Sequence, residues 1–288
     1  METRSTLPLA LLVMACFACN SLVTRAVVNQ GLLDPATLTI ARFAAGAAVL
    51  AALLAARGRA REAWPRRADW PLVFFLGAYA LAIAYGYRHI TAAAGTFVFY
   101  ALVIATMTAG GARPSWRAAA GAALALGGVA VLAIGRVAGT SPMGVALLAA
   151  TGATWGGYSL LLRKRGAPLA TNARAFVGLV AVLPLLAWFE RDALRVTAAG
   201  LALGLGMGAL TTALAYALWA RVLPGLSPIE AGTLQLLVPV LTAAGGVATL
   251  REPFTRQLAI AAGLVLAGMC LTVQRPETAA APPVRPKA

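Results

Sequence analysis

The chain has 288 residues, of which 60% are apolar and 11% charged, and its formal net charge is +15. A soluble domain carries about 25% charged residues, so this composition excludes an ordinary water-soluble protein and indicates one embedded in lipid. Only helices and closed barrels satisfy every backbone group in hydrocarbon, and the apolar runs have the helical length of about twenty residues without the alternation of barrel strands. We therefore predict an all-α integral membrane protein.

In chain order, the apolar runs between charges, prolines and tryptophans predict ten transmembrane helices. Their expected ranges are 7–27, 36–56, 70–88, 91–110, 116–136, 142–163, 171–189, 197–221, 227–249 and 255–274. We expect the first helix to be retained and not cleaved as a signal peptide, because of its length and its match to a later helix. The end of the chain, 277–288, is rich in Ala and Pro and is expected to be a disordered tail.

The basic residues lie between the apolar runs. They are densest at Arg57, Arg59, Arg61, Arg66 and Arg67. Because Lys and Arg are enriched in short cytoplasmic loops, this distribution predicts a multi-pass inner-membrane protein with both termini in the cytoplasm and with contacts to anionic lipids. A basic protein can also bind nucleic acid, but such short loops offer no folded reading surface, and no nucleic acid partner is expected.

The sequence contains an internal repeat. The segment ending in SLVTR at Arg25 is similar to the one ending in SLLLR at Arg163, and ARFAAG from Ala41 is similar to ARAFVG from Ala173. We expect one five-helix repeat in 1–138 and a second in 139–276. An odd number of helices makes the second repeat enter from the opposite side, so the halves have inverted topology. Inverted repeats are typical of transporters that expose a site to each side in turn, and one chain, as a possible monomer, holds the whole path.

Several motifs resemble the drug/metabolite transporter superfamily, in its ten-helix EamA-type branch. They are an Arg early in the second helix of each half (Arg42, Arg174), W-x-x-Y-S at Trp155 to Ser159, and the run from Leu226 through Pro239 to L-x-E-P at Leu250 to Pro253. The resemblance covers residues 7 to 274 and implies export of amino acids and related metabolites across the bacterial inner membrane. It also implies a central cavity lined by helices 1, 3, 4, 6, 8 and 9.

Within that branch the chain resembles the YddG-type aromatic amino acid exporters. Polar and aromatic side chains on helix faces provide the groups that such a substrate needs, since rings offer an apolar wall and polar groups fix the ends. The candidate substrate-binding residues are Asn20, Tyr79, Thr96, Phe97, Tyr100, Thr151, Trp155, Tyr158, Ser159, Thr212, Tyr216, Trp219 and Gln235. For each ring, simple packing between helices is the alternative interpretation.

Charges and helix breaks within a membrane are candidates for coupling and gating. Arg42 and Arg174 are expected to guide a carboxylate or to reach the headgroups, and Glu230 is expected to be the carboxylate inside the bundle, as a proton carrier or an ion-pair partner. Pro239 is the candidate hinge, whereas paired glycines such as Gly156 and Gly157 are interpreted mainly as helix-packing sites.

Catalytic and cofactor motifs are missing from the sequence. Cys16 and Cys19 form a C-x-x-C without further ligands, so neither a metal nor a cofactor is expected. No nucleotide-binding loop or hydrolase motif is present, so the chain is predicted not to be an enzyme. The alternatives that stay open are export of an aliphatic amino acid or an organic anion on the same scaffold and, from another class, a membrane enzyme or assembly factor.

Overall fold

The computed structural model describes residues 6–87, 89–90, 92–134, 141–189, 191, 194–250 and 254–272. Within these residues the structure is helical, and its only β-pairing is an isolated bridge between Leu33 and Val196. Seven helical segments of the described chain are long and apolar enough to cross a membrane. The predicted tail 277–288 and Glu252 of the family motif lie outside the described residues.

The helices agree closely with the predicted spans. They are α1 (Thr6–Asn29), α2 (Pro35–Ala55), α3 (Trp70–Gly86), α4 (Ala92–Ala109), α5 (Trp116–Ala133), α6 (Pro142–Arg163), α7 (Pro168–Val180), α8 (Leu183–Phe189), α9 (Ala198–Met207), α10 (Ala215–Val222), α11 (Pro228–Leu234), α12 (Leu237–Leu250) and α13 (Arg256–Thr272). Three of the spans are interrupted. The seventh consists of α7 and α8, the eighth of α9, a π-helix η4 (Gly208–Leu214) and α10, and the ninth of α11 and α12.

Local sequence explains where several helices begin. Ser115, Ser141, Thr197 and Ser227 each accept a hydrogen bond from a backbone N–H of the first turn, which satisfies a donor that has no intrahelical partner. Proline follows Ser141 and Ser227 directly, at a position where its missing N–H costs nothing. Short 3₁₀ turns η2 (Ala60–Ala63) and η3 (Arg67–Asp69) form the connection between α2 and α3.

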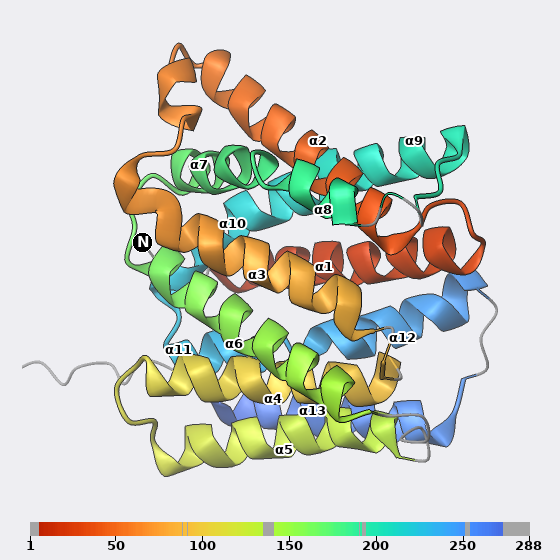
Figure 1. The fold of residues 1–288 in the computed structure, drawn as a ribbon. Coiled ribbons are helices and arrows are strands. Elements are labelled where there is room, and N and C mark those ends of the chain that lie inside the picture. Colours follow the sequence, from red (N-terminus) through yellow and green to blue (C-terminus); the bar gives the residue numbers. More distant parts are fainter. Residues whose placement is uncertain are drawn as a thin grey trace, which may run out of the picture.

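The helices cross the molecule in alternating directions, so the connections gather at its two ends (Figure 1). One end carries the connections 56–69, 110–115, 164–167 and 223–227 and the start of α1, on the left of Figure 1. We call it the arginine-rich end, because it holds five arginines between α2 and α3 and the pair Lys164 and Arg165 after α6. The five are Arg57, Arg59, Arg61, Arg66 and Arg67. The other end carries the turn between α1 and α2.

Packing between helices follows the expected repeat. In the second half α6 packs against α3 and α4 of the first half, and α1 packs in the same way against α10 and α12 of the second. The equivalent helices α2 and α7 pack against each other, as do α5 and α13, which lie side by side along one edge of Figure 1. These reciprocal contacts are those expected of two halves with inverted topology.

Small residues bring α5 and α13 into close contact. A Cβ atom built on Gly121 would lie 2.5 Å from the carbonyl oxygen of Gly268, and one built on Gly268 would lie 2.5 Å from the backbone nitrogen of Ala125. Neither position accepts a larger side chain without separating the helices. This backbone contact holds the two halves together where lipid offers no hydrophobic driving force between helices.

At the end opposite the arginine-rich end, Asp34 joins the connection between α1 and α2 to the segment before α9. It caps α2 through the backbone N–H groups of Ala36 and Thr37, and it accepts a hydrogen bond of 2.8 Å from the backbone N–H of Arg195. Burial of the carboxyl raises its pKa, but these bonds and one from the Thr37 hydroxyl outweigh burial and hold the pKa of Asp34 below its usual value. The ionised form therefore stabilises this end of the fold.

Candidate functional site

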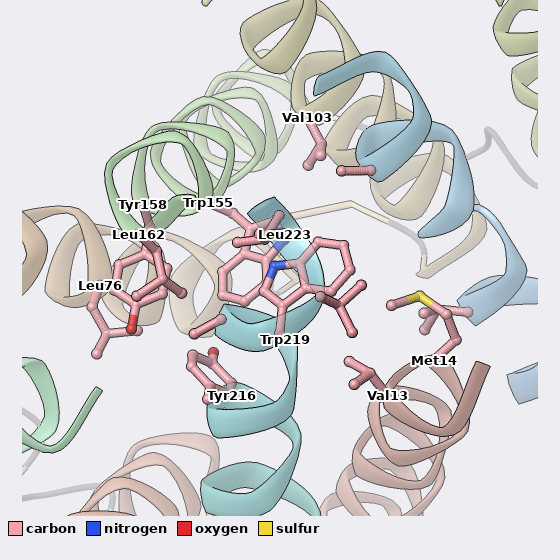
Figure 2. Packing of buried hydrophobic residues seen from close by; sticks show 14 of the residues in the cluster. Val13, Met14, Leu76, Val103, Trp155, Tyr158, Leu162, Tyr216, Trp219 and Leu223 are labelled. Carbon is pink, nitrogen blue, oxygen red and sulfur yellow. The ribbon is translucent and has the colours of Figure 1, made fainter. Parts of the chain in front are cut away.

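Six rings from both halves form a group around Trp155, which we call the aromatic cluster: Phe17, Tyr79, Trp155, Tyr158, Tyr216 and Trp219. Phe17 and Tyr79 are partly buried and the other four are buried. The centroid of Trp155 lies 5.8 Å from that of Phe17, 5.2 Å from that of Tyr79 and 5.2 Å from that of Tyr216. Figure 2 shows Trp155 and Tyr158 on α6 beside Tyr216 and Trp219 on α10. Trp155 is only 4% exposed, so the rings pack directly on one another.

Helical spacing explains why these residues meet. Trp155, Tyr158 and Ser159 are separated by three and four positions on α6, so they share the face that packs inward. Tyr216 and Trp219 are spaced in the same way on α10. The indole N–H of Trp219 donates to the hydroxyl of Ser159 at 3.3 Å, which joins the two faces. Phe17 of α1 fits edge-on against both tryptophans and Tyr216.

Gln235 satisfies the polar edge of Trp155. The indole N–H of Trp155 donates to the Gln235 side-chain carbonyl at 2.5 Å, and the Gln235 amide donates to the carbonyl of Ala231 at 3.1 Å. Gln235 lies in the gap between α11 and α12. Because Pro239 has no N–H, the Gln235 carbonyl loses its usual partner four residues later, and it accepts instead from Val238 at 3.0 Å. The predicted hinge residue thus lies one turn after a helix break.

Asn172 of α7 is a buried polar residue that the sequence analysis did not select. It accepts a hydrogen bond of 2.7 Å from the Tyr158 hydroxyl and donates to the backbone carbonyl of Tyr216 at 3.1 Å. Its side chain is fully buried. An Asn within an apolar helix was the available signal, since such a group is costly in lipid unless it has a partner. Asn172 therefore links the Tyr158 ring to the backbone of α10 at Tyr216.

A second set of polar side chains lies where α1 contacts the π-helix η4. Asn20 of α1 accepts hydrogen bonds from the hydroxyls of Thr211 and Thr212, and its amide donates to the carbonyl of Thr211 at 3.2 Å. π-helical segments are rare and occur often at functional sites. Thr212 is one helical turn before Tyr216, so this polar group adjoins the aromatic cluster.

Arg42 lies about two turns inside α2, beside η4. Its guanidinium carbon is 4.6 Å from the centroid of the Phe43 ring, and its buried Nε atom has no hydrogen-bond partner among the residues that the structure describes. The carbonyl oxygen of Arg42 lies against Gly208, so α2 and the start of η4 are in close contact. The Phe43 ring in turn packs on Phe176, and Phe176 packs on Tyr216, so two rings link this cation to the aromatic cluster.

Arg174, the equivalent residue of the second half, is arranged differently. It forms an ion pair of 2.8 Å with Asp69, whose side chain is 1% exposed, and Arg165 approaches the same carboxylate at 3.5 Å. The expectation that Glu230 is the one carboxylate inside the bundle is therefore incomplete, because the sequence analysis missed Asp69. Asp69 directly precedes α3, and only the fold brings it to Arg174. The pair neutralises Arg174 at the arginine-rich end.

The other predicted site residues are not among the rings around Trp155, although Thr151 lies one turn before Trp155 on α6. The hydroxyl of Thr151 donates to the Leu147 carbonyl of its own helix at 2.7 Å, and Thr96 bonds to Tyr87 near the end of α3. Phe97 packs on the core, and Tyr100 stacks edge-on against Phe99 with centroids 4.5 Å apart. The centroid of Phe99 lies 6.4 Å from that of Tyr79, so Phe99 links Tyr100 to the aromatic cluster.

Glu230 forms a capping box at the start of α11. Its carboxylate accepts from the backbone N–H of Ser227 at 2.7 Å, while its own N–H donates to the Ser227 hydroxyl at 3.3 Å. This reciprocal pair satisfies two donors at the helix start. Glu230 therefore has a structural contact at the arginine-rich end. No group of three or more potential metal ligands occurs in the part of the chain that the structure describes.

Comparison with known proteins identifies the family. A model described as the EamA-like transporter family matches residues 142–274. The chain is 38% identical over 275 residues to the uncharacterized protein PA1977 of Pseudomonas aeruginosa, covering 94% of this chain and 95% of that protein. A solved crystal structure with 20% identity superposes with a TM-score of 0.81, covering 94% of this chain and 96% of the other, which shows a shared fold. The chain belongs to the EamA-like transporter family of multi-pass membrane proteins.

Proposed function

We propose that this protein exports amino acids, and most specifically aromatic ones, by alternating access. The observation that carries the proposal is the aromatic cluster, which joins α1 and α3 of one half to α6 and α10 of the other. Its polar groups, Gln235, Ser159 and Asn172, lie at the edges of the rings. A site made by both halves is the kind that their relative movement can open to each side in turn.

The chemistry beside the cluster fits the two ends of an aromatic amino acid. A substrate ring can stack among Trp155, Tyr216 and Phe17, since aromatic pairs prefer the edge-on and offset geometries seen here. Within the described chain the buried Nε–H of Arg42 has no hydrogen-bond partner, so it can donate to a carboxylate, and a tryptophan face attracts an ammonium group. Binding then satisfies a donor that is otherwise costly to bury.

Movement is part of the proposal, because the rings are buried against one another. Two interruptions in the helices lie where a hinge is needed. The gap between α11 and α12 holds Gln235 and precedes Pro239, and η4 precedes Tyr216. A broken or π-helical segment concentrates a change in backbone dihedrals in a few residues. We propose these two segments as the hinges that part the rings.

The charges favour a zwitterion over an organic anion with several negative charges. Asp69 neutralises Arg174, so that residue does not add to the positive charge offered by Arg42. A polyanion needs several unpaired basic groups at one depth to offset its desolvation. A small aliphatic amino acid is the main alternative substrate, but it would leave the ring surfaces of the site without aromatic partners.

Energy coupling is proposed to be facilitated exchange. Glu230 was the candidate proton carrier, but its carboxylate accepts the Ser227 backbone N–H in the capping box at the start of α11. If exchange instead depends on a proton gradient, the substitution Glu230→Gln separates coupling from capping, because Gln also serves at the third position of a capping box.

The placement in the cell follows from the charges. The arginine-rich end carries most of the described basic connections, which favours a cytoplasmic position for that end and for both termini. We propose a bacterial inner-membrane protein made of a first repeat in 1–138 and a second in 139–276, with no nucleic acid partner and no enzymatic activity. Because both halves contribute to the one site, a monomer is sufficient for transport.

Counterflow in liposomes tests the proposal. Purified protein is reconstituted with internal unlabelled amino acid, and entry of labelled phenylalanine, tryptophan, threonine and lysine is followed with and without a proton gradient. We expect entry of the aromatic pair alone, unchanged in Glu230→Gln if exchange is facilitated. Entry of threonine at the same rate as tryptophan would favour the aliphatic alternative. No entry of any of the four, from folded protein, would refute the amino acid assignment.

A further inference from the structure

A groove on the outside of the bundle has no part in the proposed transport path. It lies between α2, η2 and α7, has a volume of about 540 Å³, and is lined almost wholly by apolar surface. The floor is the alanine face of α2 from Ala44 to Ala55, and Ala63, Trp64 and Val177 form part of its sides. We call it the alanine groove. Because alanine carries only a methyl group, the space beside α2 is left open to a ligand.

The length of the groove along α2 matches the thickness of the hydrocarbon in one leaflet of a bilayer. Ala44 and Ala55 are separated by eleven positions, which at 1.5 Å per residue gives a length of about 16 Å. Half of a hydrocarbon core of about 30 Å is about 15 Å. Ala55 is the last residue of α2 at the arginine-rich end, whereas Ala44 and Val180 lie toward the middle of the bundle. The groove therefore runs from one membrane surface to the midplane, as an acyl chain does.

The mouth of the groove is strongly basic. The residues from Arg57 to Arg67 include five arginines and a single acid, Glu62. Glu62 forms an ion pair with Arg59 at 2.6 Å, and Arg57 and Arg61 are exposed. Trp64 lines the groove and is 70% exposed, a placement typical of indoles at the headgroup level. An apolar slot thus ends in a cluster of positive charge at the membrane surface.

We propose that the alanine groove binds one anionic phospholipid, with an acyl chain along α2 and the phosphate on the arginines of the connection that follows it. A neutral lipid fits the slot but lacks the net negative charge that complements the mouth. A second copy of this chain is disfavoured as the occupant, because an isologous contact brings the same patch of each copy, with its arginines, face to face. This site is separate from the aromatic cluster.

Native mass spectrometry of the detergent-purified full chain tests the proposal with phosphatidylglycerol and phosphatidylcholine of identical acyl chains. We expect preferential retention of one phosphatidylglycerol by at least about fivefold, the effect of a single arginine–headgroup contact. The pair Ala48→Phe and Ala52→Phe fills the groove and should abolish this retention. Leu53→Phe, an exposed position of α2 outside the groove, is the matched control and should retain the lipid.

A second set of variants tests the charges while leaving the groove open. Arg57→Gln with Arg61→Gln should remove the preference for phosphatidylglycerol. Arg113→Gln with Arg117→Gln should keep it, because these exposed residues lie in the connection 110–115 and at the start of α5. Equal retention of the two lipids by the unmodified protein would overturn the proposal. So would full retention by the groove-filled protein, or a dimer that filling the groove dissociates, since a second copy would then be the occupant.

Discussion

The bond between Trp155 and Gln235 gives a quantitative test of the aromatic cluster. The two side chains are 4% and 1% exposed, and their donor and acceptor atoms are 2.5 Å apart. Trp155→Phe keeps a ring in place but removes the N–H, which leaves the Gln235 carbonyl buried without this donor. An orphaned buried polar group costs about 1–3 kcal/mol. The smaller ring adds a packing loss that is independent of the hydrogen bond.

A double-mutant cycle separates these two effects. Gln235→Leu alone orphans the indole N–H, while the double variant Trp155→Phe with Gln235→Leu removes both polar partners, and such paired replacement is close to neutral. We therefore expect the double variant to be more stable than the sum of the single losses predicts, with a coupling energy of about 1–2 kcal/mol.

Reversible unfolding in mixed micelles, followed by tryptophan fluorescence, measures the four proteins of the cycle. Trp116→Ala serves as a reference for the loss of an indole, because Trp116 is 80% exposed and lies outside the cluster. Losses that add to within about 0.3–0.5 kcal/mol would show no direct coupling and would refute the arrangement of Trp155 against Gln235.

Three further predictions concern the framework around the site. Asp69→Asn leaves a buried guanidinium uncompensated and should destabilise the fold by about 3 kcal/mol in the same unfolding assay, whereas Glu62→Gln, at an exposed pair, should change stability little. Gly268→Ala should lower the free energy of unfolding by about 1–3 kcal/mol, because the added methyl group forces α13 away from α5. The control Gly263→Ala has open space beside it and should be neutral or stabilising. Equal effects of the two substitutions would contradict the close contact of α13 with α5. Because the pKa of Asp34 is lowered in the fold, its stabilisation is complete above the ordinary Asp value of about 4 and is lost as the pH falls from there through the lowered pKa. The thermal midpoint of the unmodified protein should therefore exceed that of Asp34→Ala at pH 7, and the difference should shrink as the pH falls below about 4.

The positions of the membrane helices were predictable because lipid imposes a simple rule on each segment. Apolar runs of the required length set the spans, and the predicted 142–163 and observed α6 coincide. The interpretation of Gly156 and Gly157 as packing sites also agrees with the structure, since α6 is continuous and the glycines face Thr106 and Phe75 of neighbouring helices. The π-helix η4 was not predicted, because an added residue in a helical turn leaves no mark on hydropathy.

The candidate site was predictable only in part. Helical spacing selected Trp155, Tyr158 and Tyr216, which the fold brings together. Spacing says nothing about partners on other helices, so it missed Phe17 and Asn172, and it gave Thr151 a role although the Thr151 hydroxyl bonds within its own helix. Contacts between segments far apart in the sequence decide which polar groups are free for a ligand.

The most direct test of the account is counterflow of labelled tryptophan into liposomes by the unmodified protein, by Trp155→Ala and by Trp116→Ala. We expect the unmodified protein and Trp116→Ala to load the vesicles at similar rates, and Trp155→Ala to load them at least about tenfold more slowly, as the loss of a stacking wall worth more than about 1.4 kcal/mol requires. Equal rates for all three, or none above empty vesicles, would contradict a transport site at the aromatic cluster.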